Sequence, residues 1–155
     1  MTTSNLNIGV VGAGVMGSGH LEYLSQEVSG VTVAAVAEPD QALRRSVLEQ
    51  WGIACAEFGT LEEMLDAAEL DGVVIASPDR FHAESIKLCL FRGMPALCEK
   101  PLAQTLQDGE ELAELAQVSL SETGRPLIHL GFMRRFDPPF VEVKELIQSG
   151  DLGSV

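Results

Sequence analysis

A glycine-rich turn between an apolar strand and a helix constrains the fold of this chain more than any other feature. Residues 10–17 read Val-Val-Gly-Ala-Gly-Val-Met-Gly, and the apolar run before the turn is typical of a strand in a buried parallel sheet. In such a turn the first glycine permits the bend, the second lets backbone N–H groups approach a pyrophosphate, and the third lets the helix pack on the strand. A helix over about residues 15–28 would point its positive end at those phosphates. The sequence therefore predicts a dinucleotide site formed by Gly12, Ala13, Gly14, Val15, Met16 and Gly17.

An acid follows the second expected strand. The apolar run at residues 31–37 ends on Glu38, 21 positions after Gly17 (38 − 17). A carboxylate at this spacing can accept hydrogen bonds from the hydroxyls of an adenosine ribose. It would also repel a 2′-phosphate, so the sequence favours NAD over NADP as the cofactor. In the alternative interpretation, Glu38 merely caps the following helix together with Pro39 and Asp40.

Two arginines bear on the choice between the two cofactors. Arg44 and Arg45 follow within the next expected helix, and an arginine near the end of this strand can hold the 2′-phosphate of NADP. Their position one to two turns into the helix predicts that both lie at its solvated surface. NAD therefore remains the expected cofactor, and NADP the less favoured one.

Strand and helix patterns alternate along the rest of the chain. Helices are expected at residues 40–51, 60–68, 81–91, 105–122 and 138–149, and strands at 53–56, 72–77, 95–98 and 127–131. Thr60 and Glu63 are expected to form a capping box, and Asp137 to cap the last helix. The alternation predicts an α/β fold with a doubly wound parallel sheet (Rossmann fold), in a single domain over residues 1–155.

The composition limits the possible partners and compartments. The net charge of −13 argues against nucleic acid or an anionic membrane as a partner, and no apolar run is long enough to span a bilayer. Residues 1–5 lack the pattern of a signal peptide, so a cytoplasmic location is expected. Cys55, Cys89 and Cys98 are odd in number and show no Cys-x-x-Cys spacing, which predicts reduced, mostly buried thiols and no metal site.

Further candidate residues follow the later strands of the expected sheet. They are Ser77 and Pro78, then Glu99 and Lys100, and then residues 131–135. Ligands of such sheets bind beyond the carboxyl ends of the strands, so these residues should line one crevice. The ammonium of Lys100 could polarise a C–O bond during hydride transfer or relay a proton. Glu99 could hold Lys100 in place or bind the nicotinamide-side ribose; alternatively, Glu99 and Lys100 form only a surface charge pair in a turn.

The segment that contains Glu99 and Lys100 resembles a signature of a known family. Glu99-Lys100-Pro101 resembles the signature of the glucose–fructose oxidoreductase and inositol dehydrogenase (Gfo/Idh/MocA) family. Similar segments are Ala76-Ser77-Pro78 with His82-Ala83-Glu84, then residues 131–138, and Ser149-Gly-Asp-Leu-Gly at residues 149–153. The resemblance covers essentially the whole chain, whereas the glycine motif alone would equally fit hydroxyacid or hydroxyacyl dehydrogenases.

The resemblance implies roles for the candidate residues. Gly12, Gly14 and Gly17 would lie at the pyrophosphate and Glu38 at the adenosine ribose. The nicotinamide half would be surrounded by Ser77, Pro78 and Glu99, with Lys100 reaching both cofactor and substrate. Arg134 or Arg135 would border the substrate pocket, unless the pair is plain surface. His82 would begin a helix near the cofactor, unless it only packs there, and His20 and His129 are expected to be structural.

The family also implies a second α/β domain. That domain carries the substrate-facing wall and an aspartate and a histidine that act in proton transfer, so residues 132–155 are expected to lead toward a C-terminal domain that this chain lacks. We therefore expect the chain to bind NAD(H) with little or no turnover, as part of a homo-oligomeric oxidoreductase acting on a polyol or a sugar-like alcohol. A stand-alone nucleotide-sensing regulator is the alternative, and a methyltransferase fits poorly because it would not require Lys100.

Overall fold

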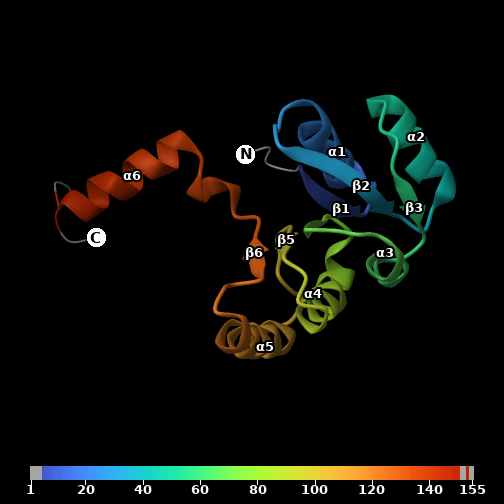
Figure 1. Ribbon diagram of the computed structural model, residues 1–155. Coiled ribbons are helices and arrows are strands. Elements are labelled where there is room, and N and C mark those ends of the chain that lie inside the picture. Colours follow the sequence, from blue (N-terminus) through green and yellow to red (C-terminus); the bar gives the residue numbers. More distant parts are fainter. Residues whose placement is uncertain (1–4, 151–152, 154–155) are drawn as a thin grey trace.

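The computed structural model describes residues 5–150 and residue 153. Its strands form one parallel sheet in the order β3-β2-β1-β4-β5-β6 (Figure 1). Strand order reverses between β1 and β4, which confirms the doubly wound α/β fold expected from the sequence. The strands are β1 (Leu6–Val11), β2 (Val31–Ala37), β3 (Ala56–Phe58), β4 (Gly72–Ile75), β5 (Ala96–Cys98) and β6 (Ile128–Leu130).

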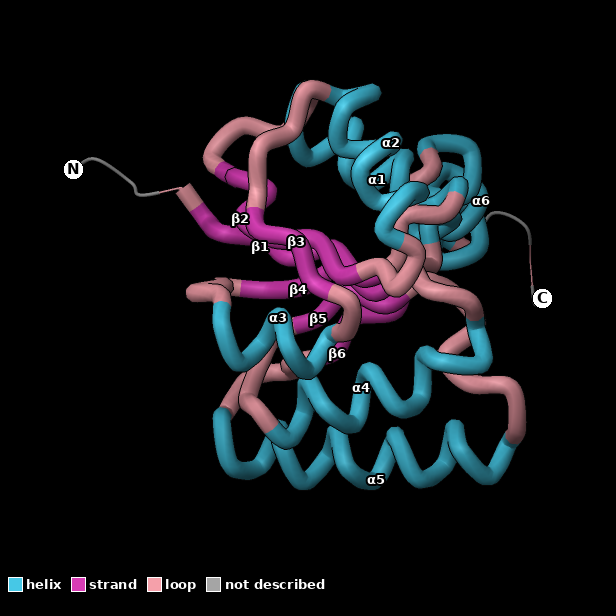
Figure 2. Tube along the Cα trace, turned by 90° about the vertical axis from the view of Figure 1, so that its right-hand side faces the viewer, coloured by secondary structure: helices cyan, strands magenta, loops and turns pink. Residues whose placement is uncertain are grey.

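Helices cover both faces of the sheet. Figure 2 shows α1 (Val15–Gln26) and α2 (Gln41–Trp51) on one face. The opposite face carries α3 (Leu61–Ala67), α4 (His82–Phe91) and α5 (Leu106–Thr123). Two short 3₁₀ helices, η1 (Asp79–Phe81) and η2 (Met133–Arg135), precede α4 and α6 (Pro138–Ser149). Among the described residues, no helix is both long and apolar enough to cross a membrane.

Two hydrophobic cores lie on either side of the sheet. Successive residues of a strand point to opposite faces, so Val10 packs with Leu21 of α1 while its neighbour Val11 packs with Met64 of α3. All of β4 is buried because helices cover both of its faces. The alternation of β1 therefore fixes which side chains enter which core.

The cysteines belong to the interior, as expected. Cys89 and Cys98 are fully buried and Cys55 is half-buried, and all three are free thiols. Burial raises the pKa of Cys89 and of Cys98 to about 12. Burial, together with the charge of Glu57, raises the pKa of Cys55 to about 11. These thiols stay protonated near neutral pH.

The expected helix caps are only partly confirmed. Thr60 and Glu63 form the capping box, with the Glu63 N–H donating to Oγ1 of Thr60 and the Thr60 N–H donating to Oε2 of Glu63, both at 3.2 Å. Asp137 occupies the N-cap position of α6, but its side chain does not cap the helix. Its carboxylate instead pairs with Arg134 at 2.6 Å, so the expectation of a side-chain cap there was wrong.

The third strand begins later than expected. The sequence predicts it at residues 53–56, whereas the structure has it at Ala56–Phe58. Gly52 ends α2 in the left-handed conformation, and Ile53 then packs on the core from a loop. The apolar Ile53 therefore marks core packing rather than the strand, whose pairing with β2 starts only at Ala56.

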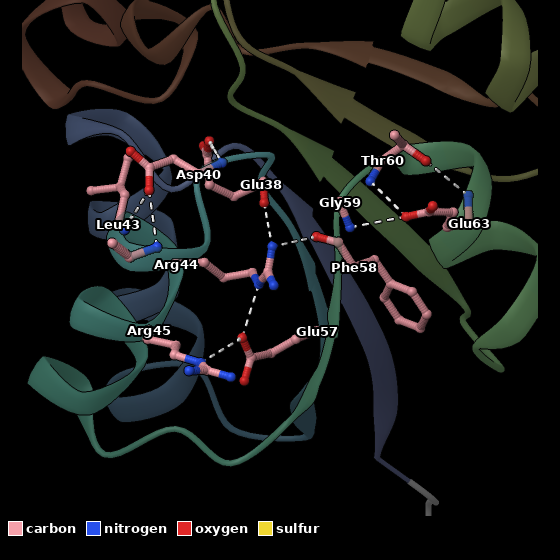
Figure 3. Close-up of polar contacts among 11 residues, drawn as sticks. Glu38, Asp40, Leu43, Arg44, Arg45, Glu57, Phe58, Gly59, Thr60 and Glu63 are labelled. Carbon is pink, nitrogen blue, oxygen red and sulfur yellow. Dashed lines mark hydrogen bonds and ion pairs between the residues drawn. The ribbon is translucent and has the colours of Figure 1, made fainter.

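Arg44 is buried, which corrects the expectation that it lies at a solvated surface. Its side chain is 10% exposed, and its guanidinium donates to the carbonyl oxygens of Glu38 and of Phe58, the latter at 3.0 Å (Figure 3). Its Nε atom donates to the carboxylate of Glu57 at 2.9 Å. The side chain thus ties α2 to the ends of β2 and β3. Arg45 lies outside with 61% of its side chain exposed, as expected.

The last helix, α6, extends away from the sheet beyond β6 (Figure 1). None of its residues is buried, and exposed apolar side chains line it: Phe140 (50%), Val143 (51%), Leu146 (40%) and Ile147 (43%). Such an exposed apolar stripe is typical of a surface that binds another chain or domain. The segment that the family resemblance places after it, at residues 149–153, lies partly outside the described residues.

We expect Arg44→Met to lower the free energy of unfolding by about 2–3 kcal/mol, because two partly buried carbonyl oxygens and a carboxylate lose their donor. Arg45→Met is the matched control; it removes an exposed side chain and should change that free energy by less than about 0.5 kcal/mol. Urea unfolding monitored by circular dichroism measures both. Equal losses in the two variants would show that Arg44 does not clamp the strands.

We also expect the chain to self-associate through the exposed stripe of α6. Light scattering over a range of protein concentrations should show a mass that rises above that of the monomer. The double variant Val143→Lys/Ile147→Lys should shift the protein to the monomer, because it places charges on the stripe. Val118→Lys, at an exposed position of α5, is the control and should leave the association unchanged. A monomer at high concentration in the unchanged protein would refute this expectation.

Candidate functional site

The strands of the sheet end in one row. Pairing places Val11 opposite both Ala37 and Ile75, and it places Ile75 opposite Cys98, which is paired in turn with Leu130. The residues that follow these strand ends therefore leave the sheet at the same edge: Glu38, Gly12, Ala76, Glu99 and Gly131. This edge is where parallel α/β sheets bind their ligands.

A cleft of about 870 Å³ opens at this edge, a volume suited to a cofactor or other small ligand. It brings together seven of the residues expected to bind the cofactor: Gly12, Gly14, Val15, Met16, Glu38, Ser77 and Pro78. They come from the β1–α1 turn, the end of β2 and the end of β4. Their contact with a cofactor stays a prediction, but the fold places them around one space.

The glycine turn leaves room where a phosphate would approach. Gly12 has φ +92°, and a Cβ atom on Gly17 would lie 1.9 Å from the carbonyl oxygen of Gly12, so α1 packs directly on the turn. A Cβ atom on Gly14 would meet nothing within 4 Å. No described side chain caps α1 and its first turn contains no acid, so the N–H groups at the very start of the helix and its positive end remain available at the cleft.

Glu38 is held in place by backbone N–H groups. Its Oε2 atom accepts from Ala13 at 3.0 Å and its Oε1 atom from Asp40 at 3.0 Å. The cap of α2 comes from Asp40, whose Oδ1 atom accepts from Ala42 and Leu43 (Figure 3). Glu38 therefore does not cap the first turn of α2 itself, and its carboxylate borders the cleft. The N–H of Ala13 links this carboxylate to the glycine turn.

Two buried oxygen atoms in this part of the site have no partner among the described residues. They are Oγ of Ser77, after β4, and Oε2 of Glu99, after β5. Buried polar atoms nearly always have a hydrogen-bond partner, so these two mark a place where a ligand can supply one. The cradle at the turn and these atoms at the neighbouring strand ends fit a dinucleotide, which carries phosphates and ribose hydroxyls.

His82 is buried beside the site and contacts two backbone carbonyl oxygens. It is 1% exposed, and its ring nitrogens lie 2.8 Å from the carbonyl oxygen of Ser77 and 2.6 Å from that of Pro101. It thereby ties the β4–α4 turn to the segment after β5. These contacts favour the packing role over direct contact with the cofactor. The bond between Lys100 and Pro101 is a cis peptide.

The candidates Lys100, Arg134 and Arg135 do not line the cleft. Lys100 is exposed, and no hydrogen bond or ion pair joins its ammonium to another described residue. Arg134 pairs with Asp137 and lies over the ring of Phe140 at 4.8 Å, while Arg135 is exposed. The arginines therefore sit beside α6, at the β6 end of the sheet, and their role at a substrate stays a prediction. His129 is also exposed, in β6.

Sequence reasoning missed several parts of the site. The contact of the His20 ring with Glu99 at 2.9 Å was not foreseen, although it is compatible with the structural role expected for His20. The cleft is also lined by the segment after β3, residues 59–62, and by Arg80 and Phe81 after β4. The capping box at Thr60 was the available signal, because it marks a helix that begins just beyond a strand end. No pattern in the sequence pairs His20 with Glu99.

Comparison with known proteins agrees with this geometry. A profile described as an oxidoreductase family with an NAD-binding Rossmann fold matches residues 6–120. Inositol 2-dehydrogenase of Leifsonia xyli subsp. xyli is 40% identical over 154 residues, which cover 99% of this chain and 44% of that protein. Inositol 2-dehydrogenase 2 of Saccharopolyspora erythraea is 41% identical over 151 residues, or 96% of this chain and 42% of that protein.

A solved structure shows the same fold. It is myo-inositol dehydrogenase from Lactobacillus casei in complex with NAD(H) and myo-inositol, with a TM-score of 0.89 and 25% identity over 97% of this chain and 43% of that one. This chain spans less than half the length of these relatives. The family description agrees with the expectation of NAD as the cofactor. The chain therefore belongs to the Gfo/Idh/MocA family of oxidoreductases, which have an NAD-binding Rossmann fold.

Proposed function

We propose that this chain is the NAD-binding part of an oxidoreductase that transfers hydride between a nicotinamide cofactor and a polyol or sugar-like alcohol. The observation that carries the proposal is the cleft at the strand ends, where the open glycine turn faces the carboxylate of Glu38. The relatives that cover nearly all of this chain are inositol dehydrogenases, which supports a polyol as the substrate class.

The candidate residues in and around the cleft divide into two groups along the cofactor. The turn from Gly12 to Gly17 and the N-terminus of α1 would hold the pyrophosphate, and Glu38 would accept hydrogen bonds from the adenosine ribose. Ser77, Pro78 and Glu99 would surround the nicotinamide half. Bound NAD supplies the centre that accepts or donates the hydride.

Lys100 is the residue proposed to act on the substrate. It directly follows Glu99 at the end of β5 and is exposed at the edge where the other strand ends meet. Its ammonium would polarise the C–O bond of an alcohol or ketone, or relay the proton of the substrate hydroxyl. Arg134 and Arg135 would border the substrate, and a homo-oligomer is the proposed assembly.

The same geometry supports NAD over NADP. The carboxylate of Glu38 is fixed toward the cleft by two backbone N–H groups, where a 2′-phosphate would meet its charge. Arg44 contacts the carbonyl oxygen of Glu38, and its guanidinium is already bound to Glu57 and to two carbonyl oxygens. Arg44 is therefore not free to hold a phosphate.

Calorimetric titration with NAD⁺, NADH, NADP⁺ and NADPH tests the binding. We expect dissociation constants of roughly micromolar to low-millimolar size for NAD(H) and weaker binding of NADP(H). Glu38→Ala should weaken NAD⁺ binding by about tenfold, because the ribose hydroxyls lose a charged acceptor. Glu49→Ala, at an exposed position of α2 outside the cleft, is the control and should bind as the unchanged protein does. Absence of binding for all four nucleotides would refute the proposal.

A second measurement concerns turnover. We expect this chain to form little or no NADH from NAD⁺ and myo-inositol, because it spans only 42–44% of the length of the inositol dehydrogenases that it matches. The absorbance of NADH over time is the measurement, and an intact inositol dehydrogenase is the positive control. Rapid, inositol-dependent formation of NADH by this chain would show that its own residues suffice.

A further inference from the structure

The contact between His20 and Glu99 joins two segments that the proposed function leaves separate. His20 lies in α1, and its Nε2 atom is 2.9 Å from Oε1 of Glu99, 79 positions further along the chain. The two side chains are 22% and 12% exposed. An ionised carboxylate only accepts hydrogen bonds, so Nε2 of His20 is the donor in this pair.

Glu99 has little freedom apart from this contact. Its backbone N–H donates to the carbonyl oxygen of Ile75 at 2.9 Å, which continues the pairing of β4 with β5. Gly131 lies against its side chain, since a Cβ atom there would be 3.5 Å from Oε1. With the backbone fixed and Oε1 bound to His20, the direction of Oε2 is determined.

The second carboxylate oxygen is the one that lacks a partner. Oε2 of Glu99 is buried without a hydrogen bond to any described residue, as is Oγ of Ser77 at the end of the adjacent strand. A ribose hydroxyl can donate to a carboxylate oxygen and accept from a serine hydroxyl. Each of the two atoms, which follow adjacent strands, is therefore able to bind a sugar hydroxyl.

We propose that His20 is a positioning residue, which binds one oxygen of Glu99 so that the other points at a hydroxyl of the nicotinamide-side ribose. The inference rests on the proposed function, because it requires NAD to bind in this cleft. His20 itself does not touch the cofactor. It acts through the carboxylate, and it links α1, which carries the phosphate site, to the residue that precedes Lys100.

The test compares two ligands that share the adenosine and the phosphates. NAD⁺ carries the second ribose and the nicotinamide, whereas ADP lacks both. Calorimetry should show that His20→Ala weakens NAD⁺ binding about tenfold, while ADP binding stays within about twofold of that of the unchanged protein. His20→Gln keeps an N–H donor and should recover most of the NAD⁺ affinity. His129→Ala removes an exposed histidine and should change neither ligand.

A double-mutant cycle separates this role from general damage to the fold. Glu99→Ala should lose as much NAD⁺ affinity as His20→Ala does, and the double variant should lose no more than Glu99→Ala alone. Thermal unfolding of each variant checks that it is folded. If His20→Ala does not fold, the NAD⁺ affinities of His20→Gln and Glu99→Ala test the inference instead. Unchanged NAD⁺ affinity in Glu99→Ala overturns it.

The outcomes distinguish this inference from the proposed function. Equal weakening of NAD⁺ and ADP by His20→Ala would show a purely structural role, and additive losses in the double variant would show that His20 does not act through Glu99. Either result overturns the inference while the unchanged protein still binds NAD⁺. An unchanged protein that binds neither ligand overturns the proposed function, and this inference falls with it.

Discussion

The parallel pairing aligns the carboxyl ends of the described strands at one edge of the sheet, and the rest of the structure depends on this alignment. A shift of one residue in β1 would exchange Val10 and Val11 between the two cores, because neighbouring residues face opposite sides of the sheet. The packing of the cores therefore fixes the register, and the register fixes which residues emerge together. Glu38 and Glu99 are 61 positions apart (99 − 38), yet both leave the sheet at one edge because of this pairing.

At the end of β2, contacts within the protein hold the side chain of Glu38 in one orientation. Glu38 uses both carboxylate oxygens on backbone N–H groups and its carbonyl oxygen on Arg44. Arg44 is held in turn by Glu57 and Phe58 of β3. A side chain that is oriented before binding loses less conformational freedom when the ligand arrives. The buried arginine is thus best understood as part of the support for the acid, and its charge is compensated within the protein.

Much of this arrangement could be predicted from the sequence, because periodicity and glycine spacing are local properties. Such patterns predict the strand–turn–helix at Gly12, the acid at Glu38 and the doubly wound parallel sheet. The wrong prediction for Arg44 concerns a side chain whose partners lie on other elements of the fold. Arg44 was placed at the surface because helical arginines usually are, while strand-end carbonyl oxygens bury it. The pairing of His20 with Glu99 depends on how α1 crosses the sheet, which no spacing within one segment encodes.

The two halves of the site differ in how far their polar groups are satisfied. Around β2 and β3 the side chains of Glu38, Asp40 and Arg44 all find partners within the protein. At the ends of β4 and β5, Ser77 and Glu99 each keep one buried oxygen without a partner among the described residues, at a cost of about 1–3 kcal/mol per atom. A ligand that donates to these atoms removes that cost, so binding there stabilises the fold as well as the complex. If the proposed function holds, one half of the dinucleotide meets preformed geometry and the other half meets groups that a ligand completes.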